Sequence, residues 1–239
     1  MVKATPTKSR TPFYGLLLLL AVAGGSGIWY SMKGNESKPI TLDESVTANL
    51  PAAEGYLYGD PNAKVTIMEF GDYECPTCAR FATIAEPDIR ARIIDAGLAN
   101  FRFFDFPIPE IHPNTLAASL AASCAADQGK FWQMHDAIFE HQDEWNSQVT
   151  NNPKKLLDGY AEKVGVDMKA YGECFSSQRN LPRIQANRAA GTARGINGTP
   201  TFVINNTVYD YKTTPDDMKR VVDSLLATMP KTAPDTTKK

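Results

Sequence analysis

Residues 64–78 of the chain read KVTIMEFGDYECPTC. Residues 64–70 are mostly β-branched or large and apolar, which is typical of a buried strand. Residues 71–74 predict a turn, and a helix is predicted to begin at Cys75 and to end at about residue 95. The stretch therefore predicts a strand, a turn and a helix, with Cys75 and Cys78 where the helix begins.

The spacing of these two cysteines supports either metal binding or thiol–disulfide exchange. Exchange is favoured because the first cysteine stands at a helix N-terminus, where the helix dipole and free N–H groups can lower a thiol pKa to roughly 3.5–7.5. Pro76 suits the first helical turn, where its missing N–H costs nothing. Cys78 lies one turn further on, where its thiol can reach a mixed disulfide formed at Cys75.

A zinc site at the pair would require a second pair of ligands. Cys124 and Cys174 stand alone in the sequence, and none of the three histidines forms a close partner for them. Redox chemistry is therefore favoured over a zinc site or an inert pair, and we expect neither a metal nor a cofactor. In an oxidising compartment the two remaining cysteines most simply pair with each other; two separate buried thiols are the alternative.

The elements around the cysteine stretch indicate an α/β fold. A second strand, residues 100–106, is rich in phenylalanine and ends at prolines. Helical patterns follow without a convincing strand, and then come a β-hairpin and a last helix that starts near Pro215. The predicted helices are 114–127, 130–143, 153–164, 167–177, 181–194 and 216–228, and the hairpin strands are 201–204 and 208–211. This order predicts an α/β domain with a helical insertion at about 112–194.

The N-terminus determines the predicted compartment. Residues 13–30 carry no charge and centre on five consecutive leucines, and residues 1–12 form a basic tail. A retained transmembrane anchor is favoured, because the uncharged run continues to an aromatic end suited to a membrane interface. Cleavage as a signal peptide is the alternative, because Ala21-Val22-Ala23 resembles an A-x-A site. Both interpretations place the domain in the periplasm or cell envelope, and the anchor would hold it at the inner membrane.

Composition divides the rest of the chain and excludes several classes of protein. The composition predicts a polar linker over residues 31–54, a folded domain over 55–228 and a disordered tail over 229–239.

The overall composition excludes several classes of protein. The 239 residues are 43% hydrophobic and 22% charged, which excludes collagen-like, wholly disordered and multi-span membrane proteins. The net charge is −2 overall and +4 in residues 1–38, so the remainder is acidic, which argues against nucleic-acid binding.

Three stretches together resemble a known family. They are residues 65–78 (VTIMEFGDYECPTC), 129–139 (GKFWQMHDAIF) and 198–204 (GTPTFVI), and they are similar to the signature stretches of the DsbA-like thiol–disulfide oxidoreductases. The resemblance spans about 57–227 and implies a thioredoxin fold with an inserted helical domain. It also implies a cis Thr199–Pro200 peptide beside the cysteine pair, where the neighbouring backbone accepts an extended substrate.

The resemblance and the pattern together assign candidate site residues. Cys75 is the expected nucleophile and Cys78 the resolving thiol, with Pro76, Thr77, Thr199 and Pro200 as substrate contacts and no metal. The neutral Thr77 departs from the Pro-His dipeptide of the best-known oxidases, which leaves the oxidising strength open.

Strand alternation groups Glu69 with Val65 and Ile67, so we expect a buried acid that relays the proton of Cys78; a solvent-facing glutamate is the alternative. His135 and His141 are interpreted as structural or surface residues. His112 lies in the proline-rich loop after the second strand and is a less favoured candidate for lining the active-site face.

The predicted function is an extracytoplasmic, membrane-tethered enzyme that exchanges disulfides with unfolded or folding secreted proteins. The oxidase direction is favoured and would need re-oxidation by a membrane quinone-linked partner. A reductase or isomerase of the same fold is the first alternative. A chaperone-like or zinc-binding module with a non-catalytic cysteine pair is the alternative of another class.

Overall fold

The computed structural model describes residues 40–42, 50–210 and 212–230. The predicted basic tail and membrane segment, 1–30, lie outside these residues, as do most of the predicted linker and all but the start of the predicted C-terminal tail. Ile40 and Leu42, within the predicted linker, pack against the buried core of the domain. None of the described helices has the length and hydrophobicity needed to cross a bilayer.

A five-stranded sheet carries the domain, in the order β1-β3-β2-β4-β5. The strands are β1 (Tyr56–Tyr58), β2 (Thr66–Gly71), β3 (Asn100–Asp105), β4 (Thr201–Ile204) and β5 (Thr207–Tyr209). The central strand β2 runs parallel to β3 and antiparallel to β4, while β1 and β5 pair antiparallel with β3 and β4. A parallel pair needs a crossover connection, and the helix that begins at the cysteine pair supplies it.

The crossover helix extends over residues 76–94, close to the predicted range. It consists of α2 (Pro76–Arg80), a π-helical segment (Phe81–Ala85), α3 (Glu86–Ile89) and a second π-helical segment (Arg90–Ile94). Pro87 lies inside the helix, where its ring and its missing N–H disturb the regular hydrogen-bond pattern. The wider turns of the two π-helical segments, one on each side of α3, accommodate this disturbance. The helix and the C-terminal helix α10 (Pro215–Thr228) cover the sheet face that presents Ile67, Phe101 and Phe202.

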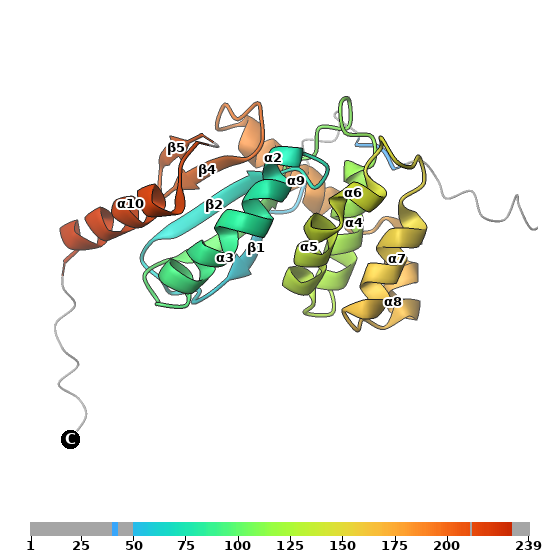
Figure 1. The fold of residues 1–239 in the computed structure, drawn as a ribbon, viewed down its shortest axis with the longest axis horizontal. Coiled ribbons are helices and arrows are strands. Elements are labelled where there is room, and N and C mark those ends of the chain that lie inside the picture. The colour runs from blue at the N-terminus through green and yellow to red at the C-terminus, as the bar shows by residue number, and fades with distance from the viewer. Residues whose placement is uncertain (1–39, 43–49, 211, 231–239) are drawn as a thin grey trace, which may run out of the picture. The chain divides into compact units, whose positions relative to one another are not determined.

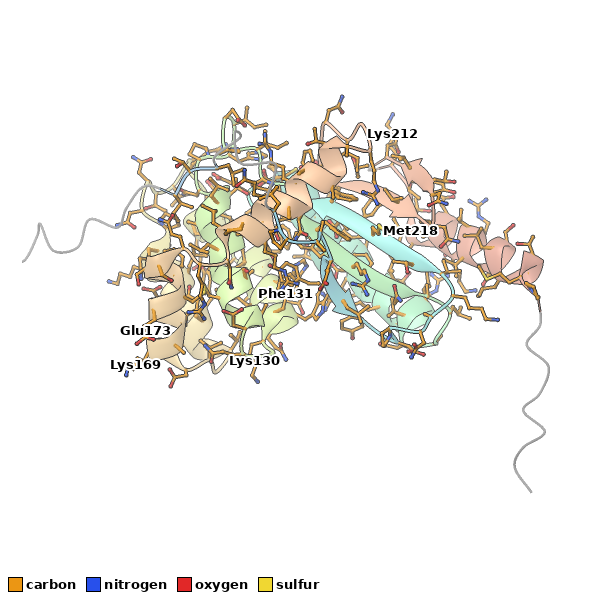
Figure 2. The ribbon with its side chains drawn as sticks, turned by 180° about the vertical axis from the view of Figure 1, so that it is seen from behind. Lys130, Phe131, Lys169, Glu173, Lys212 and Met218 are labelled. Carbon is orange, nitrogen blue, oxygen red and sulfur yellow. A yellow bond between two sulfur atoms is a disulfide. The ribbon has the colours of Figure 1, made fainter. Side chains whose placement is uncertain are left out.

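The helical insertion lies between β3 and β4 in the chain. It comprises α4 (Thr115–Ala126), α5 (Phe131–Glu140), α6 (Gln142–Trp145), α7 (Lys154–Lys163), α8 (Met168–Ser177) and α9 (Leu181–Thr192). Helices α4 to α8 pack side by side next to the sheet, and α9 returns along β3 (Figure 1). Seen from behind, Lys169 and Glu173 lie on exposed turns of α8, and Met218 of α10 lies against the sheet (Figure 2).

Three predicted boundaries differ from the structure. The helix predicted at 130–143 breaks at His141, whose backbone is not helical, and the indole N–H of Trp145 in the following turn donates back to Ile138 O at 2.8 Å. The second hairpin strand is 207–209 instead of 208–211. Helix α10 starts at Pro215 because Thr214 caps it, in a reciprocal capping box with Asp217.

Strand β1 was not predicted, because three residues are too few to show a period. Contacts with the insertion hold it in place. Tyr56 stacks on Phe131 of α5 with ring centroids 3.6 Å apart, and Trp132 Nε1 donates to Leu57 O at 2.7 Å. The strand also pairs with β3, where Tyr56 lies opposite Phe103. Tertiary contacts therefore determine this element.

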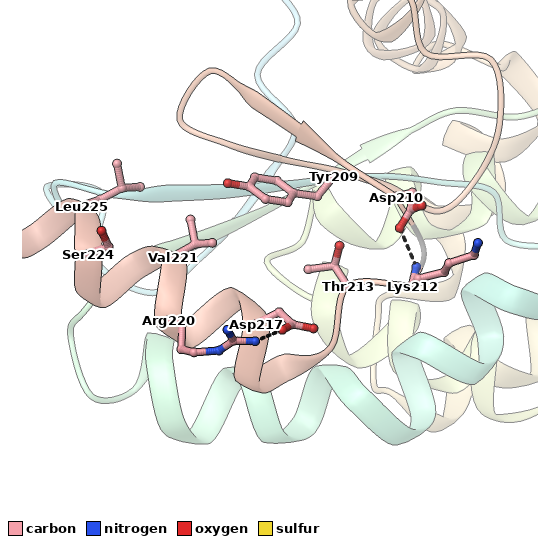
Figure 3. A pocket seen from close by; sticks show the side chains of 9 residues that line it. All are labelled: Tyr209, Asp210, Lys212, Thr213, Asp217, Arg220, Val221, Ser224 and Leu225. Atoms are coloured by element: carbon pink, nitrogen blue, oxygen red, sulfur yellow. Dashed lines mark hydrogen bonds and ion pairs between the residues drawn. The ribbon is translucent and has the colours of Figure 1, made fainter.

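A pocket of about 620 Å³ lies between the end of β5 and α10 (Figure 3). Its lining residues are Tyr209, Asp210, Lys212, Thr213, Asp217, Arg220, Val221, Ser224 and Leu225. Arg220 forms an ion pair with Asp217, three residues earlier on α10. None of the lining residues belongs to the cysteine motif or to the loop of Pro200, so this pocket is separate from the site below.

Candidate active site

Cys75 and Cys78 are both free thiols at the start of the crossover helix. Cys75 is the N-cap residue of α2, with an extended backbone, and its N–H donates to Asp72 O at 3.1 Å. Its side chain remains 8% exposed, whereas Cys78 is fully buried one turn further on. An incoming sulfur atom can therefore reach Cys75 first.

The pKa of Cys75 is lowered to about 5. The largest cause is a hydrogen bond with the Cys78 thiol; burial acts in the opposite direction. Thr199 and the backbone N–H groups of Thr77 and Cys78 add further hydrogen bonds at the start of α2. Because all of these hydrogen bonds favour the thiolate, Cys75 is ionised at neutral pH.

The pKa of Cys78 is raised well above its ordinary value. Burial is the largest cause, followed by its hydrogen bond to Cys75 and by the charges of Cys75 and Glu69. The pair therefore divides into a slightly accessible thiolate and a fully buried thiol that keeps its proton. The predicted order, with Cys75 as nucleophile and Cys78 as resolving thiol, would use this asymmetry.

The loop before β4 lies against the cysteine pair. The Thr199–Pro200 peptide is cis, and as a thiol Cys75 Sγ donates to Thr199 O at 3.5 Å. Pro200 is buried, Thr199 is half-buried, and Pro76 is exposed beside them. The structure thus brings together residues that are 124 positions apart in the chain.

Glu69 is fully buried on β2, opposite Phe103 and Phe202 of the neighbouring strands. Neither carboxyl oxygen has a hydrogen-bond partner among the described residues. Its pKa is raised well above the ordinary value, first by burial and then by the negative charge of Glu86; the charge of Cys75 acts in the same direction. Glu69 therefore faces the interior of the protein and not the solvent.

Two acids before the cysteine pair form a network that sequence reasoning missed. Asp72 is fully buried, and its carboxylate accepts four hydrogen bonds. The donors are the N–H groups of Glu74 and Ile108, Nδ1 of His112 and the hydroxyl of Thr115, at 2.6–2.8 Å. The available signal was the pair of acids immediately before a helix N-terminus, where negative charge is favoured.

Glu74 joins the same turn to the insertion. Its carboxylate accepts the backbone N–H groups of Asn114, at 2.7 Å, and Ser147. Gln142 of α6 donates to Tyr73 O at 2.6 Å and to Cys75 O at 3.1 Å. The turn that carries the reactive sulfur is therefore held by the insertion as well as by the sheet.

Another buried acid, Glu86, lies on the crossover helix. It pairs with Arg90 at 2.6 Å and with Nε2 of His135 at 3.3 Å, and His135 Nδ1 lies 3.1 Å from the Tyr73 hydroxyl. Burial tends to raise the pKa of Glu86, but His135 and Arg90 outweigh it, and the net direction is downward. Glu86 is therefore ionised, and His135 is a buried structural residue.

Cys124 of α4 and Cys174 of α8 are joined by a disulfide, with Cα atoms 5.8 Å apart. Both cysteines are fully buried within the insertion.

In the part of the chain that the structure describes, no group of three or more histidines, cysteines or acids is arranged to hold a metal ion.

Comparisons with known proteins agree with this fold. A family model described as thioredoxin matches residues 52–224. Oxidised BdbD from Bacillus subtilis is 25% identical, with a TM-score of 0.63 over 72% of this chain and 92% of that chain. DsbA from Chlamydia trachomatis is 21% identical, with a TM-score of 0.64 over 81% and 100%. Wolbachia pipientis alpha-DsbA1 is 23% identical, with a TM-score of 0.62 over 74% and 94%.

Curated sequence relatives are much longer proteins. The Na+/H+ antiporter NhaA 3 of Salinispora tropica is 35% identical over 150 residues, which are 63% of this chain and 21% of that protein. The antiporter NhaA of Herminiimonas arsenicoxydans is 30% identical over 166 residues, 70% of this chain and 24% of that protein. The chain thus spans about a fifth of the length of the curated relatives it matches.

The matched family model covers most of the chain, and the fold of the chain is similar to that of the solved DsbA structures. The chain therefore belongs to the thioredoxin family, with a helical insertion between β3 and β4, which is the fold that the sequence predicted.

Proposed function

We propose that the chain is a protein thiol–disulfide oxidoreductase that works outside the cytoplasm, most readily as a dithiol oxidase. The observation that supports this proposal best is the asymmetric pair: an accessible Cys75 with a pKa lowered to about 5 beside a buried, protonated Cys78. A low-pKa cysteine is a good leaving group and stabilises the reduced pair, which favours donation of the disulfide to a substrate.

The proposed reaction starts from the enzyme disulfide between Cys75 and Cys78. A substrate thiolate attacks the Cys75 sulfur, the Cys75–Cys78 bond breaks, and Cys78 leaves and takes up a proton. A second substrate thiolate then attacks the substrate sulfur of the mixed disulfide, and Cys75 leaves as a thiolate. The substrate loses two electrons to form its disulfide, and the enzyme pair gains them. In this proposal an extended substrate backbone lies beside Thr199, whose carbonyl oxygen is 3.5 Å from the Cys75 sulfur.

Glu69 is the proposed proton donor and acceptor for Cys78. Burial and the charges of Glu86 and Cys75 raise its pKa well above the ordinary value, which favours the protonated form, and the negative charge of its ionised form raises the pKa of Cys78. The basic and uncharged N-terminal segments support an extracytoplasmic location with an inner-membrane anchor through residues 13–30. Turnover as an oxidase further requires a re-oxidising partner, for which we propose a membrane quinone-linked protein, and its substrates would be unfolded or folding secreted proteins.

The test is oxidation of a dithiol peptide by the full chain, followed by counting free thiols. We expect catalytic turnover with an added oxidant and a reduction potential above about −230 mV in equilibrium with glutathione. A much lower potential would identify a reductase or isomerase. No turnover, together with stoichiometric bound zinc, would identify a binding module instead.

Glu69→Gln should slow the steps in which Cys78 gains or loses its proton. Glutamine keeps the shape of the side chain but cannot titrate, whereas in the reductive direction attack by the Cys75 thiolate on a substrate disulfide precedes the loss of the proton from Cys78. Stopped-flow measurement across pH should show a slower resolution by Cys78 with a changed pH profile, and a nearly unchanged first attack. Equal pH profiles for the wild type and the variant would leave Glu69 without a role in proton transfer.

The stability of the same variant provides a control. The pKa of Glu69 is raised in the folded chain, so the native state binds the carboxyl proton more tightly than the unfolded state does. Proton binding therefore stabilises the fold at low pH. This stabilisation is lost as the pH rises from the ordinary carboxyl range through the pKa of the folded state. Urea unfolding should therefore show Glu69→Gln to be more stable than the wild type at about pH 8, with a smaller difference at about pH 4.

A further inference from the structure

His112 is attached to the active-site turn through Asp72. It lies in the loop between β3 and α4, with Nδ1 2.8 Å from Asp72 Oδ2 and a side chain that is 16% exposed. The same carboxylate oxygen accepts the N–H of Ile108 at 2.8 Å, which fixes the start of this loop. The main-chain oxygen of Asp72 accepts the N–H of Cys75 at 3.1 Å. One residue, Asp72, therefore connects the imidazole with the reactive cysteine.

The groups of the turn and of α2 that act most strongly on His112 are negative when ionised. They are Asp72 and Glu74 in the turn and Cys75 at the start of α2, and each raises the pKa of His112, with the Asp72 hydrogen bond as the largest cause. Burial acts in the opposite direction and does not outweigh them. The imidazole is thus placed where its protonated form is favoured.

An ion pair and two neutral residues lie on this loop and the elements next to it. On the loop itself, Glu110 forms an ion pair with Arg188 of α9 at 4.0 Å. At the start of α4, Asn114 and Thr115 are neutral and donate to Glu74 and Asp72. His112 is therefore the side chain that can bring a positive charge to this end of the turn from the described part of the loop.

The cysteine motif itself supplies no cation. Pro76 and Thr77 between the two cysteines are neutral, and the hydrogen-bond donors to Cys75 are uncharged: the Cys78 thiol, Thr199 and two backbone N–H groups. These donors are the main causes of the low pKa of Cys75. A positive charge from another element would add to them.

We propose that protonated His112, oriented by Asp72, is a positioning residue that stabilises the Cys75 thiolate from outside the cysteine motif. The inference rests on the proposed function only in taking Cys75 as the reacting cysteine. Reduction of the enzyme disulfide creates the Cys75 thiolate, whose charge acts on His112, and oxidation removes it. By linkage, the thiolate increases the proton affinity of His112 by the same factor as the imidazolium stabilises the thiolate. His112 thus binds its proton more tightly in the dithiol form.

The first test is an NMR titration of the imidazole signals in the full chain, in the dithiol and disulfide forms. The chain has three histidines, of which His135 is fully buried and His141 is partly exposed, so His112→Gln and His141→Gln assign the signals. We expect a higher pKa for His112 in the dithiol form and no change for His141. The same His112 pKa in both forms would overturn the proposal.

The second test follows the ultraviolet absorbance of the Cys75 thiolate against pH. His112→Gln keeps a donor for Asp72 but loses the charge, so the midpoint should rise by about half a pH unit, the size expected for a partly exposed charge pair. His112→Lys should restore the midpoint toward that of the wild type, and His141→Gln should leave it unchanged. Identical midpoints for the wild type and His112→Gln would contradict the proposal, provided both unfold at the same urea concentration. Neither test requires turnover, so failure of the proposed function would be seen separately in the peptide assay.

Discussion

Alanine in place of Cys75 should reduce dithiol oxidation to the uncatalysed rate. The sulfur that remains, at Cys78, is fully buried, and burial holds its pKa well above the ordinary value, so it neither meets a substrate nor ionises. Counting the free thiols of a dithiol peptide over time measures the loss. Residual turnover well above that of buffer would show that Cys75 is not the nucleophile.

Cys78→Ala should give a different result from Cys75→Ala. The Cys75 thiolate can still attack a substrate disulfide, but the thiol that releases the mixed disulfide is missing, so enzyme–substrate complexes accumulate. Non-reducing gels should show these complexes, and mass spectrometry should locate the bond at Cys75. If this variant released substrates as fast as the wild type, the roles of the two cysteines would be reversed.

Loss of the disulfide between Cys124 and Cys174 should have the largest effect on stability. The two cysteines are 50 positions apart, and in the chain-entropy model closure of such a loop stabilises the fold by about 4 kcal/mol. For a domain of this size, that corresponds to a fall in Tm of roughly 10 °C in the Cys124→Ala, Cys174→Ala double variant.

Thermal unfolding followed by circular dichroism measures this fall, with Cys75→Ala as a control that should lower Tm much less. The peptide assay at a temperature below both transitions should show that exchange survives, because the bridge joins α4 to α8 and holds no atom of the cysteine pair. A double variant with the Tm of the wild type would show that the bridge contributes nothing to stability.

The sequence predicted those parts of the fold that depend on local pattern. The strand, turn and helix around Cys75 follow from residue types within fifteen consecutive positions, 64–78. Strand β1 could not be predicted, because Tyr56 is held by Phe131 of α5, far away in the chain. The break at His141 likewise depends on where Trp145 donates its indole N–H. Both features arise from packing, which residue periodicity does not encode.

The same limit applies to the candidate site. The cysteine pair was evident from its spacing, and alternation along β2 was sufficient to place Glu69 on the buried face. The role of Asp72 was not evident, because two of its donors, His112 and Thr115, come from positions about 40 residues away. A turn residue with an acidic side chain is ordinarily read as exposed, and only the three-dimensional arrangement shows that it is buried and fully bonded.

The turn of residues 72–75 has a consequence for protein engineering. Its two buried carboxylates, Asp72 and Glu74, obtain donors from the insertion, so a smaller scaffold that lacked residues 112–194 would leave Glu74 without its donors and Asp72 with only two of its four. Buried carboxylates without donors are strongly destabilising, and such a graft would rearrange or unfold at the reactive sulfur. A chimera that is to keep the properties of Cys75 must therefore transfer the turn and the insertion together, as one module.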